Sequence, residues 1–383
     1  MKIVYFSPDL NDKSSGVEKK ITSQVFFLKQ LGIEATVVAI TDLDPAQIES
    51  QDIWLIPRPT FSKSRFKLVN ILNRENYIIR RLWDVICQLN TDDILYMRFY
   101  YPFFRWWYFI QKKRKCKIVF EHQSLEANEY IMKGNYFYPI FDYIFGGSIR
   151  RHCDGIVGVT EEITDYQVRR SGDGKKPNVT IGNGINVDTV PVKTSFFFSD
   201  FQLHLLCVTN VTKWHGLDRI IQGINNYKGH TKIYLHIVGG GEEIPALKKI
   251  VKDLSVTDAV FFYGPLYGKD LDDMFNRCDI AVGTLGIHRK CLHEASTLKA
   301  REYCARGIPF IEGTCDLDFL PAFPYILHIP ADESPVDMTE VIRFAKTVYS
   351  DLSFSKKMRD YAKQSLDWSI KTPKLKQFLE SLA

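Results

Sequence analysis

The sequence lacks the features of a membrane-spanning, secreted or zinc-binding protein. No apolar run reaches the roughly 18 to 20 residues that span a bilayer, because Arg105 interrupts even the densest aromatic stretch. The eight cysteines are scattered without the close spacing of a zinc or redox motif, which favours small buried side chains in a reducing compartment. No basic segment and apolar stretch precede the first strand pattern, so we expect the mature chain to begin at Met1. These absences predict a cytoplasmic protein, soluble or peripheral at the inner face of the cell membrane.

The sequence does contain enough apolar residues for two domains, and one strongly basic region. Its 383 residues are 45% hydrophobic and 25% charged, which suits two α/β domains with a core each. The net charge is only +5, but residues 58–117 hold 14 Lys or Arg against four Asp or Glu, a local net charge of +10. This concentration points to a negatively charged partner at one surface.

Short apolar strands alternate with helical segments along the first half of the chain. A strand at Lys2–Ser7 leads through a loop containing Gly and Ser to a helix over 17–31, where apolar residues recur at helical spacing. Further strands are predicted at 35–40, 52–56, 94–98, 117–121, 155–160 and 179–181. The alternation indicates a parallel sheet wrapped by helices.

The same pattern restarts near residue 202. Strands are predicted at 203–209, 232–238, 260–263, 279–283 and 309–312, with helices at 216–227, 243–254, 269–277 and 297–306. We therefore expect two Rossmann-like domains over 1–190 and 200–365, and a final helix over 366–383 that packs back on the first domain. A ligand is expected at the carboxyl ends of the strands, in the crevice between the halves.

The most informative segment carries Glu294 and Glu302, which are separated by seven residues. Glu294 precedes a predicted helix, and Glu302 lies about a turn and a half into it. The amides around Ser296, Thr297 and Leu298 form the start of that helix, which attracts a diphosphate through free N–H groups and the helix dipole. A sugar nucleotide fits this spacing, with Glu302 at the ribose hydroxyls and Glu294 at hydroxyls of the sugar. The alternative is two ordinary solvated acids near a helix start.

This E-x7-E pattern, followed by a Gly-x-Pro turn at 307–309, resembles the retaining glycosyltransferases of family 4. Their GT-B fold has two Rossmann-like domains facing each other across a cleft. Other segments that resemble the family follow in its order, at 8–18, 119–122, 154–161, 181–186, 206–218 and 238–242. The resemblance spans nearly the whole chain, and the E-x7-E segment is fairly specific in this context.

The resemblance implies a function. The chain is expected to move a hexosyl group, with retention, from a nucleoside-diphosphate sugar to a glycan or lipid-linked acceptor in polysaccharide or glycolipid synthesis. The leaving phosphate would serve as base, without a dedicated protein nucleophile. His122 is expected to contact the donor sugar; the alternative is a hydrogen-bonded structural histidine. Gly16 is expected to let the backbone approach the donor, or is a simple turn glycine.

The sequence departs from the family at the diphosphate. The family usually has an Arg after the first strand of the second domain and a Lys just before the next Gly, where this chain has Asn210 and His215. We therefore predict that Lys290, helped by Arg289 and Lys213, neutralises the leaving diphosphate. The alternative is that Arg289 and Lys290 are surface charges.

No metal or other cofactor is predicted. Cations and helix amides can stabilise the charge that grows on the diphosphate. Asp316 and Asp318 match the letters of an Asp-x-Asp metal site, but they follow the Gly-x-Pro strand in a loop. We interpret them as a turn or capping pair.

Residues 96–117 predict contact with a membrane surface. Residues 96–109 hold ten aromatic side chains, and 112–115 are all basic. Amphipathic rings beside a basic run suit an interface with anionic head groups. The alternative is that half of the aromatics form a core and the basic run is a solvated helix end. Nucleic acid is not expected as a partner, because no recognised RNA or DNA module accompanies these residues.

Two other functions stay open. A nucleotide-sugar epimerase or hydrolase would also use paired carboxylates and a diphosphate site, and acceptor-dependent release of nucleoside diphosphate would separate it from a transferase. A non-catalytic GT-B subunit that binds sugar or a partner enzyme would explain the missing Arg and Lys. The presence of both Glu294 and Glu302 argues against such a subunit.

Overall fold

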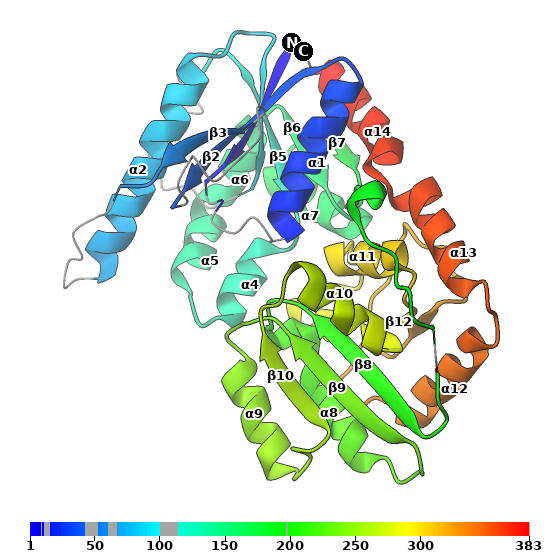
Figure 1. Ribbon diagram of the computed structural model, residues 1–383. Coiled ribbons are helices and arrows are strands. Elements are labelled where there is room, and N and C mark those ends of the chain that lie inside the picture. Colours follow the sequence, from blue (N-terminus) through cyan, green and yellow to red (C-terminus); the bar gives the residue numbers. More distant parts are fainter. Residues whose placement is uncertain are drawn as a thin grey trace. The chain divides into compact units, whose positions relative to one another are not determined.

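The computed structural model describes residues 1–8, 10, 16–42, 53–59, 67–99, 114–196 and 198–382. The chain forms two compact units, each built around its own parallel sheet (Figure 1). The first unit comprises Met1–Gly182 and Lys371–Ala383, and the second comprises Asn183–Ile370.

The sheet of the first unit has seven strands in the order β3-β2-β1-β4-β5-β6-β7. Every pairing among them is parallel. Because β1 pairs with β2 on one side and β4 on the other, the strand order reverses between β1 and β4. The strands are β1 (Lys2–Ser7), β2 (Glu34–Thr41), β3 (Ile53–Pro57), β4 (Ile94–Arg98), β5 (Lys117–His122), β6 (Gly155–Gly158) and β7 (Asn178–Thr180).

Helices cover both faces of this sheet. Helix α1 (Gly16–Gln30) buries Ile21, Val25 and Leu28 on one face, together with Leu375 and Leu379 of α14 (Trp368–Glu380). On the other face lie apolar side chains of α2 (Lys67–Cys87) and α6 (Gly147–His152). The remaining helical segments of this unit are α4 (Glu126–Met132), α5 (Phe137–Phe141), the π-helical turn η2 (Asp142–Gly146) and α7 (Glu161–Ser171).

The second unit repeats this architecture with six strands in the order β10-β9-β8-β11-β12-β13. All pairings are parallel, and the order reverses between β8 and β11. The strands are β8 (Gln202–Val208), β9 (Lys232–Val238), β10 (Val260–Gly264), β11 (Ile280–Val282), β12 (Phe310–Glu312) and β13 (Ile326–His328).

Two apolar cores fill the two faces of the second sheet. One core contains side chains of α8 (Leu217–Asn226), α9 (Ile244–Asp253) and α12 (Met338–Tyr349). The other contains side chains of α10 (Gly268–Arg277), α11 (Leu298–Arg306), α13 (Phe354–Tyr361) and the π-helical turn η6 (Ala362–Leu366). Short 3-10 turns lie at η3 (Val187–Thr189), η4 (Lys213–His215) and η5 (Ile287–Lys290).

The predicted strands are present in both units, and their ends differ from the structure by a residue or two. Of the predicted aromatic stretch, Tyr96 and Phe99 are buried core residues, and Tyr96 packs edge-on against Tyr5. Residues 100–113 lie outside the described residues. No helix in the described ranges is long and apolar enough to cross a membrane.

The packing of α14 gives a stability prediction. Leu379 is completely buried against the first sheet, so Leu379→Ala should lower the free energy of unfolding of the first unit by about 2 to 5 kcal/mol through lost burial and a cavity. Gln377→Ala on the exposed side of α14 is the control. Differential scanning calorimetry measures both variants, and equal transitions for the two would contradict this packing.

Candidate active site

The loops at the strand-order reversal of the second unit carry the predicted cations Lys213, Arg289 and Lys290. In an open parallel sheet the carboxyl ends of the strands at such a reversal leave room for a ligand. Here the chain leaves β8 into η4 and leaves β11 into η5. Backbone hydrogen bonds join the segments around these turns. The Leu285 amide donates to the His215 carbonyl at 3.1 Å, and the Gly286 amide donates to the Trp214 carbonyl at 3.1 Å.

Helix α11 begins in this region, and Thr297 is its N-cap residue. The Thr297 hydroxyl accepts a hydrogen bond from the Ala300 amide at 3.3 Å. The amides of Leu298 and Lys299 precede the first residue that can bond within the helix, so they have no intrahelical acceptor. The start of α11 therefore presents N–H groups and the positive end of a helix dipole, as predicted from the sequence.

Ser296 holds the start of α11 against the beginning of the second unit. Its hydroxyl accepts from the Asn183 amide at 2.7 Å, and its carbonyl accepts from the Asn183 side chain. Arg301 in turn donates to the Asn183 carbonyl at 2.8 Å. The hydroxyl of Ser296 thus has a structural partner, which leaves its backbone amide as the group for the predicted phosphate contact.

Glu294 lies in a short extended segment that pairs with the chain after β12. It forms an isolated parallel bridge with Cys315. The Ala295 amide donates to the Cys315 carbonyl at 2.9 Å, and the Cys315 amide donates to the His293 carbonyl at 3.0 Å. These bonds fix the backbone of Glu294 three residues before the helix cap, with its side chain half-buried.

Glu302 lies inside α11 and is half-buried. One of its oxygens accepts from Arg306 at 2.9 Å, one turn further along the helix. Arg306 also pairs with Asp272 of α10 at 2.7 Å and lies 4.1 Å above the ring of Phe275. Glu302 is therefore held in place from its C-terminal side, and its second oxygen accepts no hydrogen bond from the described part of the chain.

Asp316 and Asp318 bind a buried arginine of α11. Both carboxylates pair with the guanidinium of Arg301, and Asp316 also accepts from the Asp318 amide at 3.2 Å. The pair thus neutralises Arg301 and caps its own turn.

The three cations predicted to face the diphosphate have different surroundings. Arg289 binds Asp218 through two hydrogen bonds of 3.0 and 2.7 Å and also pairs with Glu333. These carboxylates raise the pKa of Arg289 and already balance its charge. Lys213 is exposed in η4. Lys290 is buried, with its ammonium 4.8 Å from the centre of the Trp214 ring.

His215, at the position where the resemblance leads us to expect a lysine, is a buried neutral residue of the turn. Its Nδ1 accepts from the Thr212 amide at 3.1 Å, so the proton lies on Nε2, which donates to the Thr209 hydroxyl at 3.0 Å. Burial lowers the pKa of His215 well below its usual value, and the nearby charges of Lys299 and Lys290 lower it further. The histidine thus builds the turn, while two lysines supply positive charge beside it.

Lys299 is a candidate residue that the sequence reasoning missed. Its ammonium donates to the Gly283 carbonyl at 2.7 Å, just past the end of β11. Burial lowers the pKa of Lys299, while the charges of Cys207 and Glu312 oppose this shift. The signal was present in the sequence, because a cation in the first turn of a helix opposes the helix dipole, and local conflicts of this kind concentrate at functional sites.

Glu312 at the end of β12 is a buried carboxylate whose charge acts on Lys299. One oxygen accepts from the Thr284 amide at 2.7 Å. Burial raises the pKa of Glu312 to about 7, against the lowering effect of the Lys299 charge. A Cβ at Gly283 would lie 2.1 Å from the second oxygen, so only glycine fits there.

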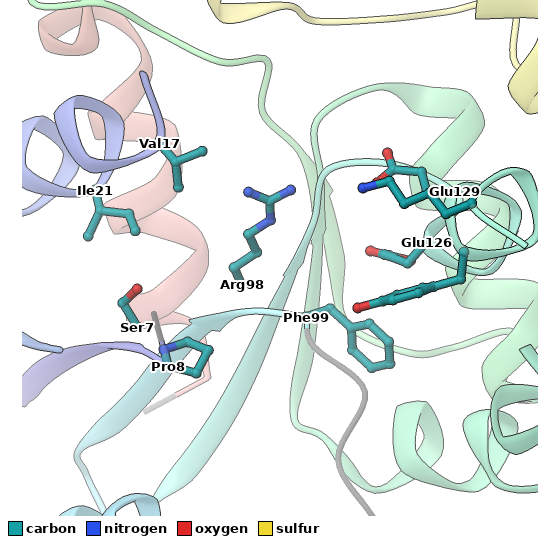
Figure 2. Close-up of a pocket in the computed structure, with 10 residues that line it drawn as sticks. Ser7, Pro8, Val17, Ile21, Arg98, Phe99, Glu126 and Glu129 are labelled. Atoms are coloured by element: carbon teal, nitrogen blue, oxygen red, sulfur yellow. The ribbon is translucent and has the colours of Figure 1, made fainter. Parts of the chain in front are cut away.

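The first unit has a pocket at its own strand-order reversal. It has a volume of about 280 Å³ and is lined by residues that follow β1 and β4, by α1 and by α4 (Figure 2). Arg98 projects into the pocket between Val17 and Ile21 on one side and Glu126 and Glu129 on the other (Figure 2). Phe99 adds an aromatic wall.

His122 lies behind this pocket and does not line it. Its ring is completely buried and stacks on Phe99 with centroids 4.5 Å apart. Its Nδ1 bonds one oxygen of Glu126 at 2.9 Å, and Gln167 donates to the other oxygen at 3.1 Å. Burial lowers the pKa of His122, while Glu126 opposes this shift. Its Nε2 has no partner among the described residues.

Glu121, next to His122, anchors α1 to the sheet. This buried carboxylate pairs with Lys20 and accepts from Gln24 at 3.0 Å and from Tyr96 at 2.6 Å. The network fixes the start of α1, where Gly16 is the first, exposed residue. Residues 11–15, which form most of the predicted glycine loop, lie outside the described residues.

Comparison with a family model connects the second unit with glycosyltransferases. Residues 196–314 match the family model described as Glycosyl transferases group 1. This stretch includes η5, the E-x7-E segment and Lys299. No curated protein matches the chain.

Solved structures resemble the whole chain. Sucrose-phosphate synthase from Thermosynechococcus elongatus matches with a TM-score of 0.72 at 14% identity, over 100% of this chain and 99% of that one. Anabaena HepE in complex with UDP and glucose matches with a TM-score of 0.65 at 11% identity, over 100% of both chains. The pneumococcal O-GlcNAc transferase GtfA in complex with UDP and GlcNAc matches with a TM-score of 0.63 at 11% identity, over 100% of this chain and 99% of that one. The chain therefore has the GT-B fold, and its second unit carries a glycosyltransferase group 1 domain.

The raised pKa of Glu312 gives a pH prediction. The folded state holds the Glu312 proton up to about pH 7, whereas an unperturbed glutamate has a pKa of 4.5, so the free energy of unfolding should fall as pH rises between these values. Glu312→Gln removes this titration. Between pH 5 and pH 8 the variant should therefore lose less unfolding free energy than wild type, by on the order of 1 to 3 kcal/mol. Urea unfolding at both pH values measures the difference. Identical pH dependence of variant and wild type would contradict it.

Proposed function

We propose that the chain is a retaining glycosyltransferase of family 4 that moves a sugar from a nucleoside-diphosphate sugar to a glycan or lipid-linked acceptor. The observation that carries this proposal is the start of α11, bracketed by Glu294 and Glu302, inside the stretch that matches the group 1 model. Two of the similar structures are complexes with UDP and a sugar, which supports a nucleotide sugar as donor.

The proposed reaction breaks the bond between the anomeric carbon and the diphosphate oxygen, and the electron pair stays on that oxygen. The amides of Leu298 and Lys299 and the helix dipole would stabilise the negative charge as it grows. The acceptor hydroxyl would attack from the same face, and its proton would pass to the leaving phosphate. A metal ion is not required in this scheme, because fixed cations supply the positive charge.

Lys290 is the strongest of the three predicted cations for this task. The carboxylates of Asp218 and Glu333 already balance Arg289. Lys290 is buried in η5 at the same strand-order reversal, and its charge and that of Lys299 act together on His215. We propose that Lys290 and Lys299 supply the positive potential that Arg and Lys supply in the family, with Lys213 and Arg289 in supporting positions.

Glu302 and Glu294 would hold the two ends of the donor. The free oxygen of Glu302 can accept from a ribose hydroxyl while the other stays bound to Arg306. Glu294 precedes the helix cap by three residues, and its backbone is fixed by the bridge to Cys315. It is the carboxylate for hydroxyls of the transferred sugar.

The pocket of the first unit suits a sugar of the acceptor. A guanidinium, two carboxylates and aromatic rings line it, which offers donors, acceptors and an apolar face to a pyranose. Because the ring of His122 is fully buried, we propose that His122 acts by orienting Glu126. Direct contact between His122 and the donor sugar, expected from the resemblance, would require the ring to become accessible.

The membrane contact predicted for residues 96–117 stays a prediction, as does the cytoplasmic location. Tyr96 and Phe99 are buried and take no part in it. The remaining aromatic residues and the basic run up to residue 113 lie outside the described residues.

The nucleotide site can be tested without knowing the sugar. Glu302→Ala should weaken binding of UDP, or of whichever nucleoside diphosphate binds the wild type, by about tenfold to a hundredfold, because hydrogen bonds to an ionised carboxylate are lost. Asp272→Ala is the matched control, since it removes the other partner of Arg306 away from the predicted ribose position. Isothermal titration calorimetry measures both. Equal losses in the two variants would assign the effect to Arg306 and contradict the ribose role.

Turnover tests the role of Lys290. A thermal-shift screen of nucleotide sugars identifies the donor, and acceptor-dependent release of nucleoside diphosphate then reports transfer. Lys290→Gln should reduce kcat by about a hundredfold or more, because charge on the leaving group loses a fixed cation. Lys248→Gln, which removes another lysine held over an aromatic ring in the same unit, is the control. Unchanged turnover in Lys290→Gln would reject the assignment.

A further inference from the structure

A continuous helical segment of the first unit, from α5 through η2 to α6, exposes an unusual number of large apolar side chains. The exposed large apolar side chains between residues 136 and 144 have exposed fractions of 49 to 81%. A helix face of this kind is normally buried, and contiguous exposed apolar side chains mark interaction sites. We call these residues the outer face: Tyr136, Phe137, Ile140, Tyr143 and Ile144.

The inner side of the same segment is apolar as well. Tyr138, Phe141 and Phe145 pack against the core formed with α2 and α6. The segment is therefore apolar on both sides, and only one side is covered by described residues of the unit. Burial in this unit accounts for the inner side and leaves the outer face unexplained.

Buried ion pairs fix the rotation of the segment. Asp142 is buried on the inner side and pairs with Arg150 at 2.6 Å and Arg170 at 3.1 Å. Arg150 also lies 4.4 Å above the ring of Phe99. Gly146 leaves the space for this pair, since a Cβ there would lie 2.1 Å from a carboxylate oxygen of Asp142. Turning the outer face inward would leave these charges buried and unpaired, so the face stays outward.

The exposed charges within the segment itself are positive. Between residues 130 and 151, the exposed charged side chains are Lys133 and Arg151, and the only acid, Asp142, is buried. The neighbouring helix α2 contacts the segment through a hydrogen bond between Glu75 and Tyr138. Glu75 is buried there, and the adjacent Arg74 is exposed. The described segment 130–151 thus combines exposed apolar and aromatic side chains with two exposed cations, while the acids of the preceding helix α4, Glu126 and Glu129, are half-buried.

We propose that the outer face docks on an anionic membrane surface. Apolar side chains and tyrosines would enter the interfacial layer, and the flanking cations would lie at the head groups, as amphipathic rings and basic side chains do at such surfaces. This surface is distinct from residues 96–117, and it does not rest on the proposed sugar transfer.

Vesicle co-sedimentation of the full chain tests the proposal. Wild type should bind equimolar phosphatidylcholine and phosphatidylglycerol vesicles more strongly than phosphatidylcholine vesicles. The double variant Ile140→Ser, Tyr143→Ser should bind at least about tenfold more weakly, because its apolar contacts with lipid are lost. Leu320→Ser with Leu352→Ser removes two exposed leucines of the second unit and is the control. Thermal unfolding verifies that each variant is folded.

The charge contribution is measured separately. Lys133→Gln with Arg151→Gln should reduce binding to the anionic vesicles and weaken its dependence on salt, while binding to neutral vesicles stays unchanged. The proposal is overturned if wild type binds neither vesicle, or if the Ile140 and Tyr143 double variant binds as wild type does. A self-association of wild type that this variant abolishes, without vesicle binding, would assign the face to a second copy of the chain and overturn it as well.

Discussion

The proposed site of the second unit depends on the positive charge at the start of α11. The helix dipole and free amides already favour an anion there. The chain adds Lys299 in the first helical turn, where a cation opposes the dipole, and Lys290 beside it. The nearby Glu312 has a raised pKa, so it balances this charge incompletely near neutral pH. Under the proposed function, a bound diphosphate would supply negative charge at this position.

The first unit uses buried polar contacts for a different purpose. Glu121 ties Lys20, and hence α1, to the end of β5. The next residue, His122, orients Glu126 at the wall of the pocket. Both contacts lie at the carboxyl ends of strands beside the strand-order reversal, where a parallel sheet offers space for a ligand. Glu121 is buried and holds the helix, whereas Glu126 lines the pocket, with its two oxygens oriented from the interior by His122 and Gln167.

The sheets were predictable from the sequence because their central strands, such as β1, β4, β5 and β11, are buried on both faces and read as continuous apolar runs. The start of α11 was predictable from its boundaries, since Thr297 is a cap residue and the helix ends at a Gly-x-Pro turn. The ion-pair partners of the charged side chains were not predictable from the sequence. That Arg289 is neutralised by Glu333, 44 residues away, follows from tertiary contacts alone. The strand β13 and the outward orientation of Tyr143 also depend on packing between segments distant in sequence.

The most direct test is a crystal structure of the protein soaked with UDP. The account predicts that the diphosphate lies within hydrogen-bonding distance of the Leu298 and Lys299 amides, with the Glu302 carboxylate at the ribose and the Lys290 ammonium on the phosphate side. A nucleotide bound elsewhere in the chain, with both Glu294 and Glu302 directed to solvent, would contradict it.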